Sequence, residues 1–276
     1  MNEVAVITGA AGGVGTSVAR LLGGTQRLLL TDVDSEKLSG LVASLTDEGY
    51  QVEGISGDLG DPLVAADLAD CCAKTGEIRS IVNAAGLSPA QAAWQAIIRA
   101  NTIGPVNLLN SLEPLLTARS ACVMVASVAG HLGPRDETIE ELLDNPLQPA
   151  LFEKLEPRLE AIVEACGGSM AGHAYSFSKR AIIRLCEIRA PSWGKQQARI
   201  VSVSPGVIWT PMGRREAESG DRAQALADVT PAGRWGTAMD VATTAEFLLS
   251  DTASYITGSD VQVDGGAVAA MRGKAF

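Results

Sequence analysis

Short apolar runs alternate with longer amphipathic segments along this chain. The runs have the length and continuity of strands buried on both faces of a sheet, at 4–7, 27–31, 52–55, 80–82, 121–126, 199–204 and 261–263. Helical periodicity predicts helices at 13–22, 36–45, 93–116 with an interruption near Gly104 and Pro105, and 239–249. This alternation predicts an α/β fold with a doubly wound, mainly seven-stranded parallel sheet. With 276 residues, 46% of them apolar, the chain fits a single domain over residues 1–276.

A glycine-rich turn joins the first predicted strand to the first predicted helix, with the sequence Thr8-Gly9-Ala10-Ala11-Gly12-Gly13-Val14-Gly15. Where side chains are absent, backbone N–H groups and the positive end of the helix can approach a pyrophosphate. The alternative is an ordinary flexible turn. The position between a buried strand and an amphipathic helix favours the phosphate site.

Asp32 ends the second predicted strand, 17 residues beyond Gly15. A carboxylate at this point of a dinucleotide-binding fold accepts both ribose hydroxyl protons and repels a 2′-phosphate. Neither the glycine loop nor Val33-Asp34 offers an Arg or Lys to neutralise such a phosphate, so the sequence predicts NAD rather than NADP. Alternatively Asp32 caps the following helix, although Asp34 or Ser35 fills that role more naturally.

Tyr175 and Lys179 are four residues apart in a segment expected to be helical, so they share one face. The positive charge of Lys179 favours the phenolate and would lower the pKa of Tyr175 towards neutral pH, which suits general acid–base chemistry on alcohols and carbonyls. The alternative is a packed Tyr beside a surface Lys. Ser127 follows a predicted strand at the sheet edge where such folds bind ligands.

The composition narrows the possible functions. A net charge of −10 with no dense basic run argues against nucleic acid or an anionic membrane as partner. The five cysteines are odd in number, two of them (Cys71 and Cys72) are adjacent, and no pair has the spacing of zinc ligands. They therefore indicate neither a disulfide framework nor a metal site. Without an apolar signal-peptide centre or a membrane-length apolar run, we expect a cytoplasmic protein.

Taken together, the motifs resemble those of the short-chain dehydrogenase/reductase family. They are Thr8-Gly-x-x-x-Gly-x-Gly15, Asp58, Asn83-Ala-Ala-Gly86 and Tyr175-x-x-x-Lys179, in family order along essentially the whole chain. The resemblance implies a Rossmann-type fold. The cofactor-binding residues expected from the glycine loop, Asp32 and this resemblance are Gly9, Ala11, Gly13, Val14, Gly15, Asp32, Asp58, Leu59, Asn83, Ala84, Gly86, Tyr175, Lys179, Pro205, Gly206, Val207 and Thr210.

The resemblance also implies particular roles on the cofactor side. Asp58 would meet the adenine amino group, and Asn83 and Gly86 would lie along the adenosine. Val207 and Thr210, after a Pro-Gly turn, would flank the nicotinamide, with Thr210 bonding the carboxamide.

The resemblance implies a set of catalytic residues as well. Ser127 would donate a hydrogen bond to the substrate oxygen, Tyr175 would exchange the proton, and Lys179 would hold the nicotinamide ribose. Asn101 would hold a water that relays protons to Lys179. Alternatively Asn101 satisfies a backbone carbonyl at a helix kink.

One interval departs from the family pattern, because Ser127 and Tyr175 are 48 positions apart. The extra residues, about 133–170, predict two or three short amphipathic helices that roof the pocket, form a subunit interface, or remodel one. With the chain end, this insertion resembles the bacterial 3α-hydroxysteroid dehydrogenase/carbonyl reductase branch. That resemblance implies a bulky apolar ketone or secondary alcohol and a homodimer, with a homotetramer as the alternative.

We also expect particular segments and residues to form the pocket for this bulky apolar substrate. A polar segment at about 206–233 suits a mobile substrate loop. Residues expected to contact the substrate are Ser127, Leu87, Leu132, Trp209 and Met212.

The leading functional hypothesis is an NAD-dependent oxidoreductase acting on a hydrophobic secondary alcohol or ketone, such as a 3-hydroxysteroid. A non-catalytic NAD-binding regulator is one alternative, against which the set Asn101, Ser127, Tyr175 and Lys179 argues. A ketoacyl-thioester reductase is another, although NADP and a basic docking patch usually accompany that role. A sugar-nucleotide epimerase ranks last, because the length leaves no separate sugar domain.

Overall fold

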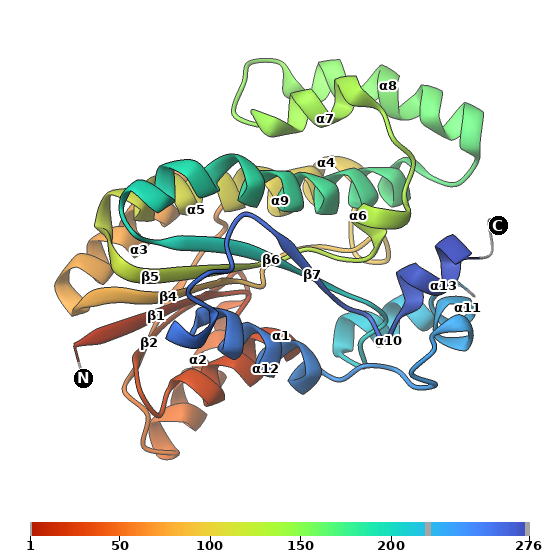
Figure 1. The fold of residues 1–276 in the computed structure, drawn as a ribbon. Helices are drawn as coiled ribbons and strands as arrows, with labels where there is room; N and C mark the ends of the chain where they lie inside the picture. The colour runs from red at the N-terminus through yellow and green to blue at the C-terminus, as the bar shows by residue number, and fades with distance from the viewer. Residues whose placement is uncertain (1, 219–221, 274–276) are drawn as a thin grey trace.

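Seven parallel strands form one sheet in the order β3-β2-β1-β4-β5-β6-β7 (Figure 1). The computed structural model describes residues 2–218 and 222–273. The strands are β1 (Glu3–Thr8), β2 (Arg27–Asp32), β3 (Val52–Ser56), β4 (Glu77–Asn83), β5 (Leu116–Val125), β6 (Arg199–Pro205) and β7 (Asp260–Val263). The chain moves outwards from β1 to β3 and then crosses to β4, so the strand order reverses between β1 and β4. The predicted doubly wound parallel sheet is confirmed.

Helices cover both faces of the sheet (Figure 1). One layer contains α1 (Gly13–Leu22), α2 (Ser35–Asp47) and α12 (Ala238–Leu249); the other contains α3 (Pro62–Thr75), α4 (Trp94–Ile98), α5 (Gly104–Leu112) and α9 (Met170–Lys195). Alternate residues of β1 feed the two cores, with Val4 and Val6 in one cluster and Ala5 and Ile7 in the other. Because both faces of the strand are buried, its sequence is continuously apolar rather than alternating.

The insertion before α9 forms two helices, α7 (Glu137–Asp144) and α8 (Leu151–Cys166). They make an outer layer over α4 and α9 (Figure 1), and a third apolar cluster, which includes Leu155, Leu159 and Phe177, joins them to α9. Buried Glu140 adds ionic contacts: it accepts a hydrogen bond from Arg135 Nε at 2.5 Å, and Arg184 lies 3.6 Å away. The insertion is therefore packed firmly against α9.

The helix expected over 93–116 is interrupted before Gly104 and Pro105, rather than at these two residues. A π-helical segment, η1 (Arg99–Ile103), separates α4 from α5, whereas Gly104 and Pro105 open α5 without breaking the chain of turns. Proline is tolerated there because its missing N–H lies in the first turn of α5. A 3₁₀ turn, η2 (Glu113–Leu115), then leads into β5.

The segment expected to be a substrate loop is instead largely helical. It contains α10 (Pro211–Glu218) and α11 (Arg222–Val229), and residues 219–221 between them lie outside the described part of the chain. The remaining elements are α6 (Ala129–Leu132), η3 (Asp251–Ala253) and α13 (Ala267–Gly273). Across residues 2–218 and 222–273, no helix has both the length and the apolar character needed to span a bilayer.

Candidate active site

The glycine-rich turn brings backbone atoms together where side chains would not fit. Gly9 has a φ of +61°, and a Cβ at Gly9 would lie 2.5 Å from the Ala85 backbone nitrogen. A Cβ at Gly15 would lie 2.3 Å from the Gly9 carbonyl oxygen. Helix α1 begins after Gly12 and has no acidic residue in its first turn. This exposed, positive helix end beside bare backbone fits the pyrophosphate of a dinucleotide.

Asp32 lies beside this turn at the carboxyl end of β2. Its Oδ2 accepts a hydrogen bond from the Ala11 N–H at 3.0 Å, and its Oδ1 accepts one from the Asp34 N–H at 3.1 Å. Asp34, rather than Asp32, caps α2 by accepting the Lys37 N–H at 3.0 Å. Asp32 is therefore held against the glycine loop, which fits recognition of a ribose next to the pyrophosphate.

The next two loops hold the residues expected on the adenosine side. Asp58 accepts the Gly60 N–H at 2.8 Å and pairs with Arg99 Nε at 3.1 Å. Asn83 is buried at the end of β4, where its Oδ1 accepts a hydrogen bond from the Thr8 hydroxyl at 2.7 Å. This last contact ties β4 to β1 at the point where the strand order reverses, which is where open α/β sheets bind ligands. Leu59 is buried in the core beside them.

The expected catalytic residues converge on one cavity of about 150 Å³. Ser127 comes from the loop after β5, and Tyr175 and Lys179 come from α9. The Lys179 Nζ lies 5.8 Å from the centre of the Tyr175 ring and donates a hydrogen bond to the Val125 carbonyl at 3.0 Å. The cavity lining consists of Gly9, Gly12, Gly13, Val14, Gly15, Ala84, Gly86, Leu87, Val125, Ala126, Ser127, Tyr175, Lys179, Pro205, Gly206, Ile208, Thr210, Met212, Gly213 and Glu216.

Asn101 reaches the same region from the π-helical segment. Its Nδ2 donates to the Leu87 carbonyl and to the Ser178 hydroxyl, both at 3.0 Å, and its Oδ1 accepts the Leu87 N–H at 2.8 Å. The side chain thus satisfies both backbone groups of Leu87 and fixes the loop after β4. Asn101 therefore does satisfy backbone groups, but those of the loop after β4 rather than a carbonyl at the helix kink; the water relay stays a prediction.

The pKa of Tyr175 is raised above its ordinary value, whereas the sequence predicted that it would be lowered. Burial raises it, the negative charge of Glu216 raises it further, and only a hydrogen bond with Ser127 opposes the shift. Burial also lowers the pKa of Lys179 to about 8, against the smaller opposing effect of Glu216. The predicted lowering of the Tyr175 pKa is therefore wrong for this structure, because burial and the charge of Glu216 raise this pKa.

Sequence comparison agrees with this arrangement. Residues 3–138 match the family model described as short chain dehydrogenase, and residues 161–268 match the one described as Enoyl-(Acyl carrier protein) reductase. The 3-alpha-hydroxysteroid dehydrogenase/carbonyl reductase of Comamonas testosteroni is 31% identical over 242 residues, which cover 83% of this chain and 91% of that protein. The chain belongs to the short-chain dehydrogenase/reductase family. The two family models leave 139–160, within the insertion, unmatched.

Other similar proteins extend the comparison. The D-threitol dehydrogenase of Mycolicibacterium smegmatis is 27% identical, covering 96% of this chain and 92% of that one. A crystal structure titled short-chain dehydrogenase/reductase SDR:Glucose/ribitol dehydrogenase, from Brucella melitensis, superposes with a TM-score of 0.76 at 26% identity and covers 96% of each chain. A short-chain dehydrogenase/reductase from Burkholderia thailandensis gives a TM-score of 0.75 at 27% identity, covering 100% of this chain and 96% of that one.

Two residues expected in this dehydrogenase's substrate pocket are not in the cavity lining. Leu132, in α6, is absent from it, and Trp209 is 55% exposed, packing edge-on against Trp235 with ring centres 5.1 Å apart. Leu87 and Met212 do line the cavity, whereas none of its lining residues comes from α7 or α8. The insertion therefore does not roof the cavity described here.

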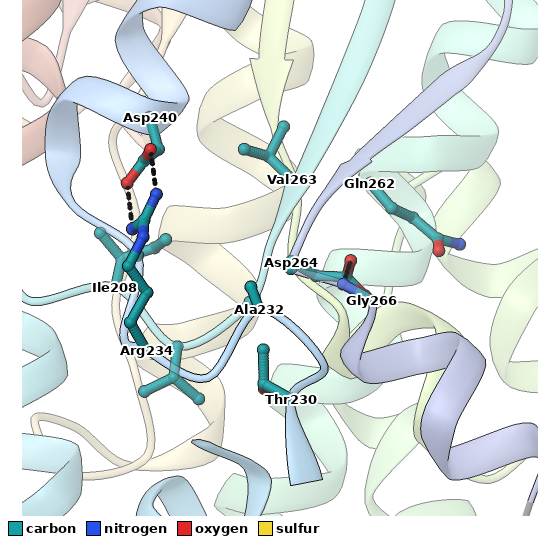
Figure 2. A pocket seen from close by; sticks show the side chains of 13 residues that line it. Ile208, Thr230, Ala232, Arg234, Asp240, Gln262, Val263, Asp264 and Gly266 are labelled. Carbon is teal, nitrogen blue, oxygen red and sulfur yellow. Dashed lines mark hydrogen bonds and ion pairs between the residues drawn. The ribbon is translucent and has the colours of Figure 1, made fainter. Parts of the chain in front are cut away.

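Val207 lines a second cavity, of about 250 Å³, which shares Gly206 and Ile208 with the first. Figure 2 shows its rim, where Arg234 makes two hydrogen bonds with Asp240, and its far wall at the end of β7. Catalytic residues are absent from the lining. The larger cavity is therefore a neighbour of the candidate active site.

Glu216 is a member of the cavity that the sequence analysis missed. It lies on α10, one helical turn after Met212, so the two side chains share a face. The i, i+4 spacing from Met212 to Glu216 was the available signal, but it has meaning only if the segment is helical. Burial raises the pKa of the Glu216 carboxyl, while the Ser88 hydroxyl and the Lys179 charge favour its ionised form.

Proposed function

We propose that this short-chain dehydrogenase is an NAD-dependent oxidoreductase that transfers hydride between the nicotinamide and a hydrophobic secondary alcohol or ketone. The observation that supports it is the convergence of Ser127, Tyr175 and Lys179 with the glycine loop around one cavity. A proton-transfer group, a hydrogen-bond donor for a carbonyl oxygen and a cation meet there. Membership of the family supports oxidoreduction at CH–OH groups.

The residues of the chain would divide the work on the substrate oxygen. Tyr175 is protonated at neutral pH because its pKa is raised, so it can give its proton to a carbonyl oxygen during reduction. Ser127 would hold the same oxygen by donating a hydrogen bond. Lys179 would favour the developing negative charge on Tyr175 and hold the ribose. The nicotinamide supplies the hydride when it is bound.

Asp32 supports NAD as the cofactor. Its carboxylate is fixed beside the glycine turn by the Ala11 N–H, where it can accept the ribose hydroxyl protons and would repel a 2′-phosphate. The glycine loop and Val33-Asp34 contain no Arg or Lys to offset that repulsion.

The apolar walls support a hydrophobic substrate. Leu87, Ile208 and Met212 all line the cavity, as expected of a site that binds a largely apolar body and fixes it with a few polar groups. The name of the Comamonas relative supports a 3-hydroxysteroid or a similar bulky carbonyl compound as the candidate.

The experiment follows absorbance of the reduced nicotinamide while NAD or NADP is offered with small cyclic alcohols and with 3α-, 3β- and 17-hydroxysteroids. We expect turnover with NAD, and a loss in kcat of at least about 100-fold in Tyr175→Phe, because the proton-transfer group is removed. Tyr255→Phe is the matched control, since Tyr255 is fully exposed, and should behave as wild type.

The alternatives give different results. NAD binding without turnover of any alcohol or ketone would favour the regulator hypothesis. Turnover of a carrier-bound ketoacyl group with NADPH would favour the thioester reductase. Normal turnover by Tyr175→Phe would remove the central step of the proposal.

A further inference from the structure

The residues that follow Ser127 form a single-turn helix, α6, and this helix orients the Ser127 side chain. The Gly130 N–H donates a hydrogen bond to the Ser127 carbonyl at 3.0 Å. The Ser127 hydroxyl oxygen accepts the Ala129 N–H at 3.2 Å, so the hydroxyl keeps its own proton to donate towards Tyr175 or a substrate oxygen. The direction of this hydroxyl is therefore set by the position of α6.

One face of α6 packs closely against α9. A Cβ at Gly130 would lie 2.8 Å from the Arg180 backbone nitrogen and 2.9 Å from the Lys179 carbonyl carbon. A Cβ at Gly133 would lie 2.5 Å from the Ser176 Cβ. The two helices therefore approach more closely here than side chains at these glycines would allow.

A different face of α6 is tied to the sheet by a buried polar cluster. The His131 Nε2 lies 2.8 Å from the Asp260 Oδ2, and the two side chains are only 11% and 8% exposed. Because a carboxylate has no hydrogen to donate, the ring nitrogen is the donor. The Asp260 Oδ1 accepts the hydroxyls of Ser202 at 2.5 Å and Ser204 at 3.0 Å, both fully buried in β6. The carboxylate is thus fixed at the start of β7, and it holds His131 in turn.

We infer that His131 is a positioning residue: its bond to Asp260 holds α6 so that the Ser127 hydroxyl points at the substrate oxygen beside Tyr175. This inference rests on the proposed function and adds a residue to its machinery. His131 is not among the residues that line the cavity around Ser127. It therefore acts on the reaction through α6 and not by direct contact.

Helix α6 depends on outside contacts for its position. It has four residues and no side-chain cap at its start, and helices shorter than about 12 residues are marginal by themselves in water. The Val128 N–H anchors its start by donating to the Pro205 carbonyl at 3.0 Å. Contact with α9 limits how near α6 can come, whereas the directional bond from His131 fixes its far end.

The proposed reaction is sensitive to small movements of Ser127. Proximity catalysis needs reacting atoms about 3–3.5 Å apart, and a displacement of about 1 Å can cost about 100-fold in rate. Without the His131 anchor, α6 can pivot about Val128. The Ser127 hydroxyl would then miss the position between Tyr175 and the substrate oxygen, which lowers kcat more than it weakens binding.

The test compares two amides at position 131. His131→Gln keeps an N–H donor at about the reach of Nε2, whereas the shorter His131→Asn does not reach Asp260. Their kcat and KM are measured with NAD and a 3α-hydroxysteroid, or with cyclohexanol if wild type turns over only small alcohols. Calorimetry gives NAD binding, and thermal unfolding reports the fold. His173→Asn is the matched control, since the other histidine of the chain also makes one hydrogen bond, at 2.7 Å to the Gly167 carbonyl.

We expect His131→Asn to lower kcat about tenfold, with the alcohol KM and the NAD dissociation constant changed less than about twofold. His131→Gln should keep at least about half of the wild-type kcat, because its amide restores the bond. His173→Asn should keep the wild-type kcat. Ser204→Ala, which removes one of the hydroxyls that hold Asp260, is a milder change and should lower kcat about threefold.

A double-mutant cycle with Ser127→Ala separates positioning from general weakening of the fold. In the Ser127→Ala background there is no hydroxyl left to misplace, so the loss caused by His131→Asn should shrink to about twofold or less. The fall in unfolding temperature caused by His131→Asn should be the same in both backgrounds, because stability does not depend on this route.

The possible failures are distinguishable. A wild-type kcat in folded His131→Asn, equal losses in the Gln and Asn variants, or a full tenfold loss in the Ser127→Ala background would overturn the inference and leave the proposed function standing. If neither variant at position 131 folds, an unchanged kcat in Ser204→Ala overturns it. If wild type turns over no alcohol of the panel, the proposed function and this inference fall together.

Discussion

The cavity that contains Ser127, Tyr175 and Lys179 is lined by backbone atoms on one side and by side chains on the other. On one side the glycine turn presents backbone, and a Cβ at either Gly9 or Gly15 would collide with main-chain atoms. On the other side α10 presents the side chains of Met212 and Glu216. Backbone positions tolerate little variation in sequence, whereas side chains on a helix can be exchanged without changing its path.

This difference matches the two things that such an enzyme must recognise. A dinucleotide is shared across the family, and a wall of main-chain N–H groups suits its pyrophosphate. A substrate differs from one enzyme to the next, and the replaceable side chains of α10, which we call the lid, suit that variety. On our proposal, changes to the glycine wall should damage binding and folding, while changes to the lid should alter selectivity and pH response.

The largest expected effect is that of Gly15→Ala. The new Cβ would lie 2.3 Å from the Gly9 carbonyl oxygen and 2.7 Å from the Ala10 Cα, so the turn must move. We expect about 1–3 kcal/mol of lost unfolding free energy, together with weaker NAD binding by calorimetry. Gly40→Ala is the matched control: Gly40 lies exposed in α2 with no atom within 4 Å of the new Cβ.

The control should change stability in the opposite direction. Ala is favoured over Gly in a helix by about 1 kcal/mol, so Gly40→Ala should stabilise the protein and leave NAD binding unchanged. If Gly15→Ala also stabilised the protein and bound NAD normally, the glycine wall would have no special steric role and the comparison between the two walls would collapse.

A smaller effect is expected from Asp32→Asn, which removes charge at the edge of the glycine wall but keeps the shape of the side chain. We expect the ratio of kcat/KM for NAD to that for NADP to fall about tenfold, equivalent to about 1.4 kcal/mol, because the repulsion of a 2′-phosphate is lost. Asp34→Asn is the control, since Asp34 caps α2 and Asn is an equally good cap. An unchanged ratio in Asp32→Asn would argue against Asp32 as the selectivity residue.

The glycine wall could be read from the sequence because its signals are local. The turn, Asp32 and the Tyr175–Lys179 spacing each depend on a few neighbouring residues, and the buried strands appear as continuous apolar runs. The order of the elements then determines the sheet topology, because strand and helix alternate throughout. For the same local reason, Asp34 or Ser35 was predicted to cap α2 in place of Asp32, and the cap is Asp34.

The structure of the lid could not be predicted from local sequence signals. The polar composition of α10 and α11 is typical of a loop, so the turn that brings Glu216 beside Met212 was missed. The direction of the Tyr175 pKa was also missed, because it depends on burial and on a carboxylate that comes from distant sequence. Likewise, η1 places Asn101 against Leu87 through contacts that no local pattern specifies.

The smallest expected effect tests the electrostatic part of the lid. Glu216 raises the pKa of Tyr175 because its negative charge disfavours the phenolate, and it opposes the burial that lowers the pKa of Lys179 to about 8. Glu216→Gln removes that charge, so both pKa values should fall. In alcohol oxidation Tyr175 must accept a proton, so the limb of the pH profile that reports the ionisation of Tyr175 should move to lower pH.

The limb that reports Lys179 should move in the same direction, because Lys179 would lose its proton at a lower pH. We therefore expect the whole pH profile of kcat for alcohol oxidation to shift down by less than about one unit, with little change in its height. Glu218→Gln, exposed on the same helix, should leave both limbs in place. An upward shift in Glu216→Gln, or equal shifts in the two variants, would show that the lid carboxylate does not act on the catalytic pair and that only its shape reaches the cavity.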